Sequence, residues 1–193
     1  MKIVDNMYIL RIVSECKKHS IKKEILNIGS GDCATDYHLI QEGFDVISTD
    51  YLKADKFEKN MVDYKHHIKW QQANILDLKS FSVDSREIVL CMEVLEHLVD
   101  YKIAFENLLK LADKTLIIGV PWKHSFNHPA PPPEGHCNWW DIGTNPSYKD
   151  AYEFEEMCKP HSFYVEKILT CPEDGATGQG TILMVINKKL TDV

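Results

Sequence analysis

Several common features of proteins are missing from this sequence. Its six cysteines form no Cys-x-x-Cys pair, which disfavours a zinc ribbon and a dense disulfide framework. The longest apolar runs, such as Thr115 to Pro121, are about a third of the length that spans a bilayer. The segment from Met1 to Asp5 lacks the apolar core of a signal peptide. We therefore expect a cytoplasmic protein with free thiols and no membrane contact.

Positive charge is scarce as well. The 22 lysine and arginine residues are outnumbered by 29 aspartate and glutamate residues, so the formal net charge is −7 at pH 7. This excess opposes non-specific attraction to DNA or RNA and argues against a nucleic-acid partner. The chain shows no internal repeat, and its 193 residues suffice for one domain with a substantial core. We expect residues 1–193 to form that single domain.

Apolar residues recur with the periods of alternating helices and strands. Helical spacing covers residues 5–19. Between the first two strands, Thr35 or Asp36 is expected to cap a helix that ends at Gly43, and Asp100 to cap the helix before the fifth strand. The expected strands are Glu24–Ile28, Phe44–Thr49, Ile68–Ala73, Glu87–Met92 and Thr115–Val120.

The C-terminal part predicts one more helix and a pair of strands. Ser147 is expected to cap a helix that stops before Pro160, and Phe163–Leu169 and Thr181–Ile186 read as a hairpin. Strands that alternate with helices and end in a hairpin predict an α/β fold. We expect a Rossmann-like, doubly wound sheet that is mostly parallel and has an antiparallel C-terminal edge strand.

Residues 121–147 show no periodicity and hold six of the eight prolines. A segment this long inside a compact domain is usually a binding loop or a lid, so we expect it to form the substrate side of the site. Trp122, Trp139 and Trp140 are expected either to wall an acceptor pocket or to pack the loop onto the sheet. The spacing of three histidines with Cys137 fits no standard tetrahedral zinc site. These histidines are His124, His128 and His136.

One short segment indicates a nucleoside site. An apolar strand leads into Gly29-Ser30-Gly31, a helix follows, and the next strand ends at Asp50. The glycines let the backbone approach a ligand closely, and the carboxylate is placed to accept hydrogen bonds from two ribose hydroxyls. Because Gly29-x-Gly31-x-x-Ala34 also fits a dinucleotide-binding turn, or simply a tight turn, this segment alone leaves the adenosine-containing cofactor open.

Four segments together resemble the class I S-adenosylmethionine-dependent methyltransferases. They are Leu26–Gly31, Asp50, Gln72–Leu78 and Val89–Leu98. The resemblance implies that S-adenosylmethionine is the cofactor and that its contacts come from Asn27, Gly29, Ser30, Gly31, Asp50, Tyr51, Asn74, Ile75, Cys91, Met92 and Glu93.

Within this resemblance, the two glycines lie under the methionine part of the cofactor, and the residues from Cys91 to Glu93 form the floor near the sulfonium. Asn74 meets the adenine amino group, or it serves simply as a turn residue. Two positions depart from the family pattern. Family members usually have an acid where Asn27 stands and a third glycine where Cys33 stands. We therefore expect a weaker or water-mediated contact to the cofactor's amino group.

Glu93, Glu96 and His97 stand at i, i+3 and i+4, so a helical turn would direct them to one pocket. With His136 from the loop, they are a candidate site for Mg²⁺. Alternatively, His97 or His136 acts as general base with Glu93 orienting it. The pattern also fits a plain helix start that favours acids. This turn resembles that of ubiquinone-biosynthesis O-methyltransferases and of small-RNA 2′-O-methyltransferases.

The first hypothesis for function is O-methylation of a small-molecule acceptor. A metal-dependent RNA ribose 2′-O-methyltransferase is the alternative, which the net charge disfavours. A non-catalytic cofactor-binding or scaffold protein of the same fold is the third. A nicotinamide-dependent oxidoreductase is the fourth, and the lack of length for a second, substrate-holding domain counts against it.

Overall fold

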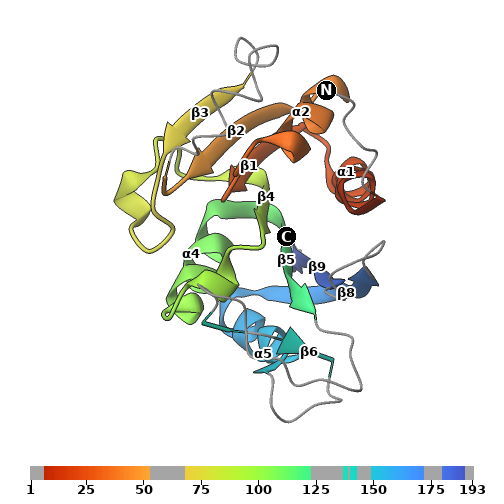
Figure 1. The fold of residues 1–193 in the computed structure, drawn as a ribbon, viewed down its shortest axis with the longest axis vertical. Helices are drawn as coiled ribbons and strands as arrows, with labels where there is room; N and C mark the ends of the chain where they lie inside the picture. The colour runs from red at the N-terminus through yellow and green to blue at the C-terminus, as the bar shows by residue number, and fades with distance from the viewer. Residues whose placement is uncertain are drawn as a thin grey trace.

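A mostly parallel sheet forms the middle of the molecule (Figure 1). The computed structural model describes residues 7–52, 68–122, 137–138, 140–142, 149–171 and 180–189. The strands are β1 Glu24–Ile28, β2 Asp45–Asp50, β3 Lys69–Gln72, β4 Arg86–Met92, β5 Ala112–Trp122, β6 Trp140–Asp141, β7 Lys149–Asp150, β8 Phe163–Cys171 and β9 Gly180–Lys188.

The strand order is β3-β2-β1-β4-β5, and these strands are parallel. β9 then pairs with β5 in the antiparallel sense, and β8 pairs with β9. The short strand β6 meets the end of β5 at the pair Trp122 and Trp140, and β7 pairs with β6. This arrangement confirms the predicted α/β, Rossmann-like sheet with its antiparallel C-terminal edge.

Helices cover both faces of the sheet, with α1 and α2 on one side and α4 and α5 on the other (Figure 1). Three short 3₁₀ turns, η1, η2 and η3, complete the described elements. The helices and turns are α1 Met7–His19, α2 Ala34–Gln41, α4 Tyr101–Leu111, α5 Glu153–Cys158, η1 Leu78–Ser80, η2 Leu95–His97 and η3 Lys159–His161.

Two apolar cores lie on the two faces. Because successive side chains of a strand point to opposite faces, Ile25 of β1 lies in the same core as Ile12 of α1, while Leu26 lies in the other core with Phe105 of α4 and Phe154 of α5. All five side chains are fully buried. Strands that are covered on both faces in this way explain the continuous apolar runs in the sequence.

The predicted caps of α2 are wrong. Cys33 is the N-cap residue, with a left-handed φ of 59°, and its side chain makes no capping hydrogen bond. Asp36 instead lies in the first turn with its side chain fully buried, where it accepts a hydrogen bond from Asn27 Nδ2 at 2.6 Å. Asp100 does hold the N-cap position of α4, although its side chain makes no capping bond there. At the end of α2, Gly43 has the left-handed φ expected of it, 83°.

The tryptophans described within the predicted loop pack against the sheet. Trp122 belongs to β5, is 8% exposed and donates from Nε1 to Asp141 Oδ1 at 3.1 Å. Trp140 is fully buried and donates from Nε1 to Glu153 Oε1 at 2.7 Å. The packing interpretation is therefore confirmed for these two residues. Trp139, His124, His128 and His136 lie outside the described residues.

The helix expected from residue 147 begins later. Ser147 lies outside the described residues, Lys149–Asp150 forms strand β7, and α5 begins at Glu153. Asp150 accounts for the later start, because its Oδ1 accepts a hydrogen bond from the backbone of Tyr152 at 3.0 Å and turns the chain into the helix.

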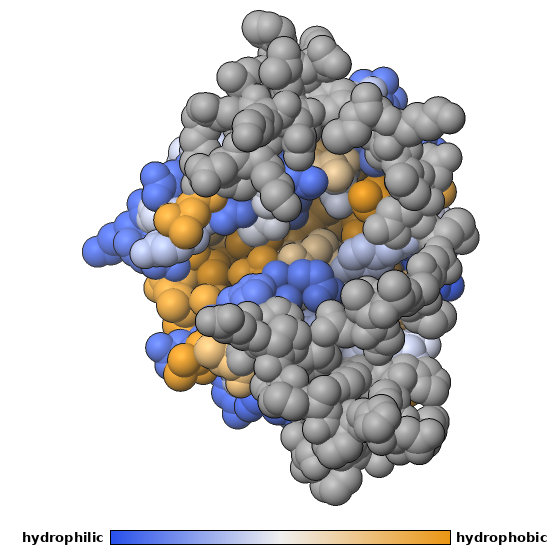
Figure 2. Space-filling view, in the orientation of Figure 1, coloured by the Kyte–Doolittle hydropathy of each residue, from blue (hydrophilic) through white to orange (hydrophobic). Residues whose placement is uncertain are grey.

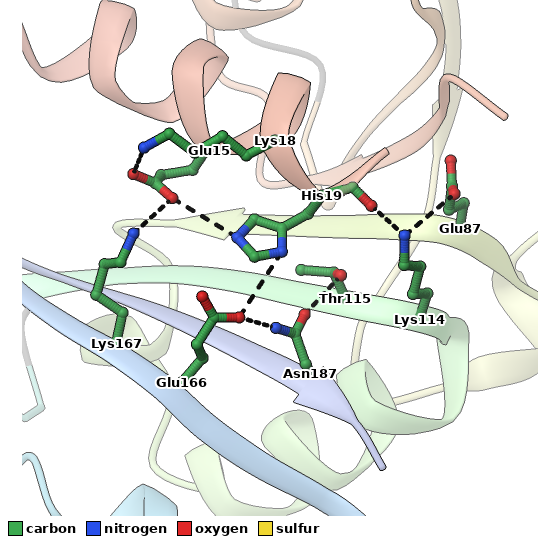
Figure 3. A network of polar contacts seen from close by, with 9 residues as sticks. All are labelled: Glu15, Lys18, His19, Glu87, Lys114, Thr115, Glu166, Lys167 and Asn187. Carbon is green, nitrogen blue, oxygen red and sulfur yellow. Dashed lines mark hydrogen bonds and ion pairs between the residues drawn. The ribbon is translucent and has the colours of Figure 1, made fainter. Parts of the chain in front are cut away.

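A polar network fastens the C-terminal end of α1 to the sheet (Figure 3). Lys114 Nζ donates to the carbonyl oxygen of His19 at 2.5 Å, and the His19 ring lies between the carboxylates of Glu15 and Glu166, at 3.7 and 3.8 Å. Glu87 accepts three hydrogen bonds of 2.7 Å from the segment that follows the helix. These contacts fix the helix against β4, β5 and β8.

The face of the molecule in Figure 2 is hollowed, with apolar side chains in the hollow and hydrophilic ones along its rim. Among the residues that the structure describes, no helix combines the length and the apolar character needed to cross a membrane.

Candidate functional site

The glycine turn after β1 is held to the end of β2. The backbone N–H groups of Gly29 and Ser30 both donate to the carbonyl oxygen of Thr49 at 2.9 Å. Gly29 and Gly31 have φ values of 74° and 52°, which favour glycine. A Cβ atom at Gly29 would overlap the side chain of Val94, whereas a Cβ atom at Gly31 would meet nothing within 4 Å. The turn therefore packs against the segment after β4 and leaves open space beside Gly31.

Asp50 connects the end of β2 to this turn. Its Oδ2 accepts a hydrogen bond from the Gly31 N–H at 2.9 Å, and its Oδ1 accepts one from Leu52 at 3.3 Å. A carboxylate has about four lone-pair sites, so these bonds leave acceptor capacity for ribose hydroxyls. Tyr51 follows directly and is 62% exposed. The arrangement fits the ribose contact that the sequence predicts for Asp50.

Asn27 lies beneath the turn and is 3% exposed. Its Nδ2 donates to Asp36, which fixes the orientation of the amide. Its Oδ1 is buried and has no hydrogen-bond partner among the described residues. A buried acceptor of this kind normally has a donor, and an ammonium group at the carboxyl end of β1 would supply one. Burial raises the pKa of the Asp36 carboxyl above its ordinary value. Hydrogen bonds from Ser48 and Asn27 lower this pKa, but the effect of burial is larger.

Asn74 has the turn role that the sequence left open. Its Oδ1 accepts a hydrogen bond from Leu76 at 3.0 Å, and its N–H donates to Ser80 Oγ at 2.8 Å. The neighbouring Ile75 is 5% exposed, and its carbonyl oxygen accepts a hydrogen bond from Asn107. The contacts of Asn74 and Ile75 with adenine stay predictions.

The segment after β4 begins with a backbone bend. Cys91 is fully buried, and Glu93 has a left-handed φ of 54°. The Glu93 N–H donates to the Gly119 carbonyl at 2.9 Å, and Glu93 Oε1 accepts a hydrogen bond from Thr181 Oγ1 at 2.9 Å. The expected helical turn is therefore wrong for Glu93, because a positive φ excludes the residue from a right-handed helix. The 3₁₀ turn η2 begins only at Leu95.

The carboxyl groups of Glu93 and Glu96 nevertheless meet. Glu96 is 1% exposed, and its burial together with the nearby Glu93 carboxylate raises its pKa to about 9. Glu96 therefore keeps its proton at neutral pH and shares a hydrogen bond with Glu93. The His97 side chain is 49% exposed, with Nε2 at 3.7 Å from Glu96 Oε1. The structure thus brings together three of the predicted site residues, namely Glu93, Glu96 and His97.

The predicted metal set is only partly described. Among the described residues, no group of three or more His, Cys, Asp and Glu side chains is arranged to hold a metal ion. His136 lies outside them. The residue after it, Cys137, donates its N–H to the Glu96 carbonyl at 2.6 Å, and Asn138 Nδ2 donates to the Leu98 carbonyl at 2.7 Å. The chain that follows His136 is therefore bonded to η2.

Three residues near this edge were not predicted as part of the site. Asp36 precedes the core residue Leu39 by three positions, and that spacing places it on the buried side of its helix, a signal that was available. Tyr8 and Thr181 reach Glu93 from opposite ends of the chain, and no local pattern marks them.

Residues 26–115 match the model of the methyltransferase domain family. No curated protein matches the sequence. Similar solved structures include the magnesium protoporphyrin IX methyltransferase of Synechocystis with bound S-adenosylhomocysteine, with a TM-score of 0.68 and 12% identity over 95% of this chain and 83% of that one.

Two further structures are similar to the chain. The 1,6-didemethyltoxoflavin-N1-methyltransferase of Burkholderia thailandensis has a TM-score of 0.66 and 14% identity over 94% of this chain and 76% of that one. The methyltransferase domain of bacterial CtHen1-C has a TM-score of 0.67 and 16% identity over 95% and 97% of the two chains. At these identities the likeness shows the fold. Residues 26–115 thus match the methyltransferase domain family, and the chain has the fold of class I S-adenosylmethionine-dependent methyltransferases.

Proposed function

We propose that this chain methylates an oxygen atom of a small molecule, with Glu93 accepting the proton of the acceptor hydroxyl. The observation that carries the proposal is the position of the Glu93 carboxylate. It lies at the carboxyl end of β4, is held by Thr181, and is one residue before Val94, which packs against the glycine turn. A base at this point would lie beside the methyl group of a cofactor bound to that turn.

The residues present fit the cofactor. Gly31 would lie under its methionine part, Asn27 Oδ1 would accept from its ammonium group, and Asp50 would hold its ribose. Tyr51 and Ile75 would flank the adenine, with Asn74 at its edge. When bound, S-adenosylmethionine supplies an electrophilic methyl group on a sulfonium. Glu93 would accept the proton that the acceptor hydroxyl loses on methylation.

The same carboxyl groups limit the acceptor. Glu93 places negative charge at the end of β4, and the buried Glu96 beside it cannot neutralise a second anion. A hydroxyl is able to donate a hydrogen bond to a carboxylate, whereas an ionised carboxylate acceptor would be repelled. We therefore expect hydroxyl acceptors. His97, half-exposed on the next turn, is the second candidate for proton transfer, and His136 is the third.

A test combines a panel of acceptors with one variant. The wild type is incubated with S-adenosylmethionine and with simple phenols, alcohols, amines and carboxylic acids, and S-adenosylhomocysteine is quantified. We expect turnover with hydroxyl compounds and a drop in kcat of about 100-fold for Glu93→Gln, at nearly unchanged cofactor affinity. Glu156→Gln, the same change at an exposed glutamate, serves as control. Turnover with carboxylic acids alone, or full activity of Glu93→Gln, would overturn the proposal.

A second candidate function is a Mg²⁺-dependent RNA ribose methyltransferase. It is favoured by the hydrogen bond between the Cys137 N–H and the Glu96 carbonyl, since this bond brings the chain after His136 to η2, the turn that carries Glu96 and His97. It predicts methylation of a short RNA at its 3′ end, with loss of activity in excess chelator and in Glu96→Ala and His97→Ala. Full activity in chelator would exclude it.

A further inference from the structure

Two residues form four hydrogen bonds to the η2 turn and the residue that ends it. The backbone N–H groups of Cys137 and Asn138 both donate to the Glu96 carbonyl, at 2.6 and 3.1 Å. The side-chain amide of Asn138 donates from Nδ2 to the Leu98 carbonyl at 2.7 Å and to the Leu95 carbonyl at 3.2 Å. All four bonds run from the same two residues to carbonyl groups of this turn. We call these two residues the η2 strap.

The turn needs such donors because it is short. η2 consists of three residues, and a single 3₁₀ turn leaves most of its carbonyl groups without a partner inside the turn. Its own bonds run from the His97 N–H to the Val94 carbonyl at 3.0 Å and from the Leu98 N–H to the Leu95 carbonyl at 3.3 Å. Glu96 is 1% exposed, and a buried carbonyl group requires a donor from the protein. The η2 strap therefore supplies the hydrogen bonds that keep this turn in one conformation.

The Asn138 side chain suits this role by its number of donors. An amide nitrogen carries two protons, and both are used, one by each carbonyl. The residue is 7% exposed, so water competes little for these protons. An aspartate has the same shape but presents an oxygen where the amide has nitrogen, and that oxygen would face two carbonyl oxygens. The site therefore requires donors at position 138, and not only shape.

The η2 strap is itself fixed by the core. Trp140 follows two residues later and is fully buried, with its ring centroid 5.5 Å from that of Tyr101 and 5.7 Å from that of Phe154. Its Nε1 donates to Glu153 Oε1, and its backbone pairs with the end of β5. The position of η2 is thus tied, through Asn138, to the helices α4 and α5 and to the sheet.

We propose that Asn138 is a positioning residue for methyl transfer, which holds η2 so that Glu96 and His97 face the acceptor. This inference rests on the proposed function, which has the acceptor hydroxyl at the Glu93 carboxylate. Glu93 is held separately, by its hydrogen bonds to β5 and β9. The η2 strap fixes the other side of the acceptor site. Asn138 lies outside residues 26–115, so the segment that matches the methyltransferase domain family contains η2 but not the residue that holds it.

The test compares two substitutions that separate the donors from the shape of the side chain. We measure kcat/KM with the hydroxyl acceptor that the wild type methylates best, and S-adenosylhomocysteine affinity by calorimetry. We expect kcat/KM to fall about tenfold in Asn138→Ala and about 50-fold in Asn138→Asp, because aspartate adds repulsion, with affinity within about twofold of wild type. A residue that only filled space would give the opposite order, since aspartate keeps the shape of asparagine and alanine does not.

Asn187→Asp is the matched control. Asn187 is a buried asparagine of β9 whose Nδ2 donates to Glu166 and whose Oδ1 accepts from Thr115 at 2.8 Å, at the opposite end of the strands from Glu93. A second carboxylate beside Glu166 should lower the midpoint of urea unfolding but leave kcat/KM within about twofold of wild type. Equal losses of kcat/KM in this variant and in Asn138→Asp would show an effect of instability, and would overturn the inference.

Hydrogen exchange gives a readout that does not depend on turnover. The N–H groups of residues 137 and 138 should exchange at least about tenfold faster in Asn138→Ala than in the wild type, while the Gly29 N–H, bonded to Thr49, should be unaffected. Unchanged exchange, or wild-type kcat/KM in Asn138→Ala or Asn138→Asp, would overturn this inference and leave the proposed function standing. A wild type that methylates no hydroxyl compound would overturn the proposed function and the positioning role with it.

Discussion

Replacing Glu96 by glutamine should make the stability of the protein less dependent on pH. The Glu96 side chain is 1% exposed, and burial beside the Glu93 carboxylate raises its pKa from an ordinary value of 4.5 to about 9. In the unfolded chain the group loses its proton near the ordinary value. Between these two values the folded state therefore binds a proton that the unfolded state has released, so the free energy of unfolding falls as pH rises.

The size of the effect follows from this difference in bound protons. One proton corresponds to about 1.4 kcal/mol per pH unit, so from about pH 5.5 to about pH 7.5 this group removes about 2–3 kcal/mol of stability from the wild type. Glutamine has nearly the same shape, keeps a donor for Glu93 and does not titrate. The Glu96→Gln protein should therefore gain that amount relative to the wild type over this range.

Urea denaturation followed by tryptophan fluorescence measures both proteins at the two pH values, in excess chelator so that no bound cation contributes. Glu156→Gln removes a carboxyl whose side chain is 72% exposed and paired with Lys159, and it should change the pH dependence little. Parallel pH profiles of the wild type and Glu96→Gln would show that Glu96 is ionised in the folded protein, and would refute the account of the carboxyl pair.

Two further predictions concern the cofactor side of the site. Asn27→Asp alone places two buried carboxyl groups against each other and should cost about 1–3 kcal/mol of stability. Adding Asp36→Asn should restore the hydrogen bond between the two side chains and the affinity for S-adenosylhomocysteine. Calorimetry and thermal melts measure both effects, and equal losses in the single and double variants would contradict this prediction. Gly29→Ala should destabilise the fold because the new methyl group would overlap the Val94 side chain. Gly31→Ala should cost about 1 kcal/mol of stability because of the positive φ at this position. It should also weaken S-adenosylhomocysteine binding about tenfold, because the methyl group fills the space beside the turn. Wild-type affinity in Gly31→Ala would count against that assignment.

The geometry of the glycine turn and Asp50 could be predicted because its signals are local. Gly29, Gly31 and Asp50 each stand next to a strand end, and the strand order of a doubly wound sheet then brings those ends together. The sequence predicts Asp36 as a cap because an acid near a helix start fits that role, and only the position of Asn27 on the neighbouring strand assigns it the buried role instead.

The surroundings of Glu93 could not be predicted in the same way. A spacing of three and four residues implied a helical turn at Glu93, but the bond of its N–H to Gly119 and its positive φ keep it outside η2. Tyr8 and Thr181 meet it through tertiary packing, which no sequence period records. The tryptophans described within the predicted loop are core residues for the same reason, since the extension of β5 to Trp122 depends on its pairing with β9.

Calorimetric titration of the wild type with S-adenosylhomocysteine, and separately with NAD, tests the central claim most directly. The account predicts one binding site for S-adenosylhomocysteine, an affinity reduced at least about tenfold in Asp50→Ala through loss of the ribose contact, and no heat from NAD. Tight NAD binding without any heat from S-adenosylhomocysteine would contradict it.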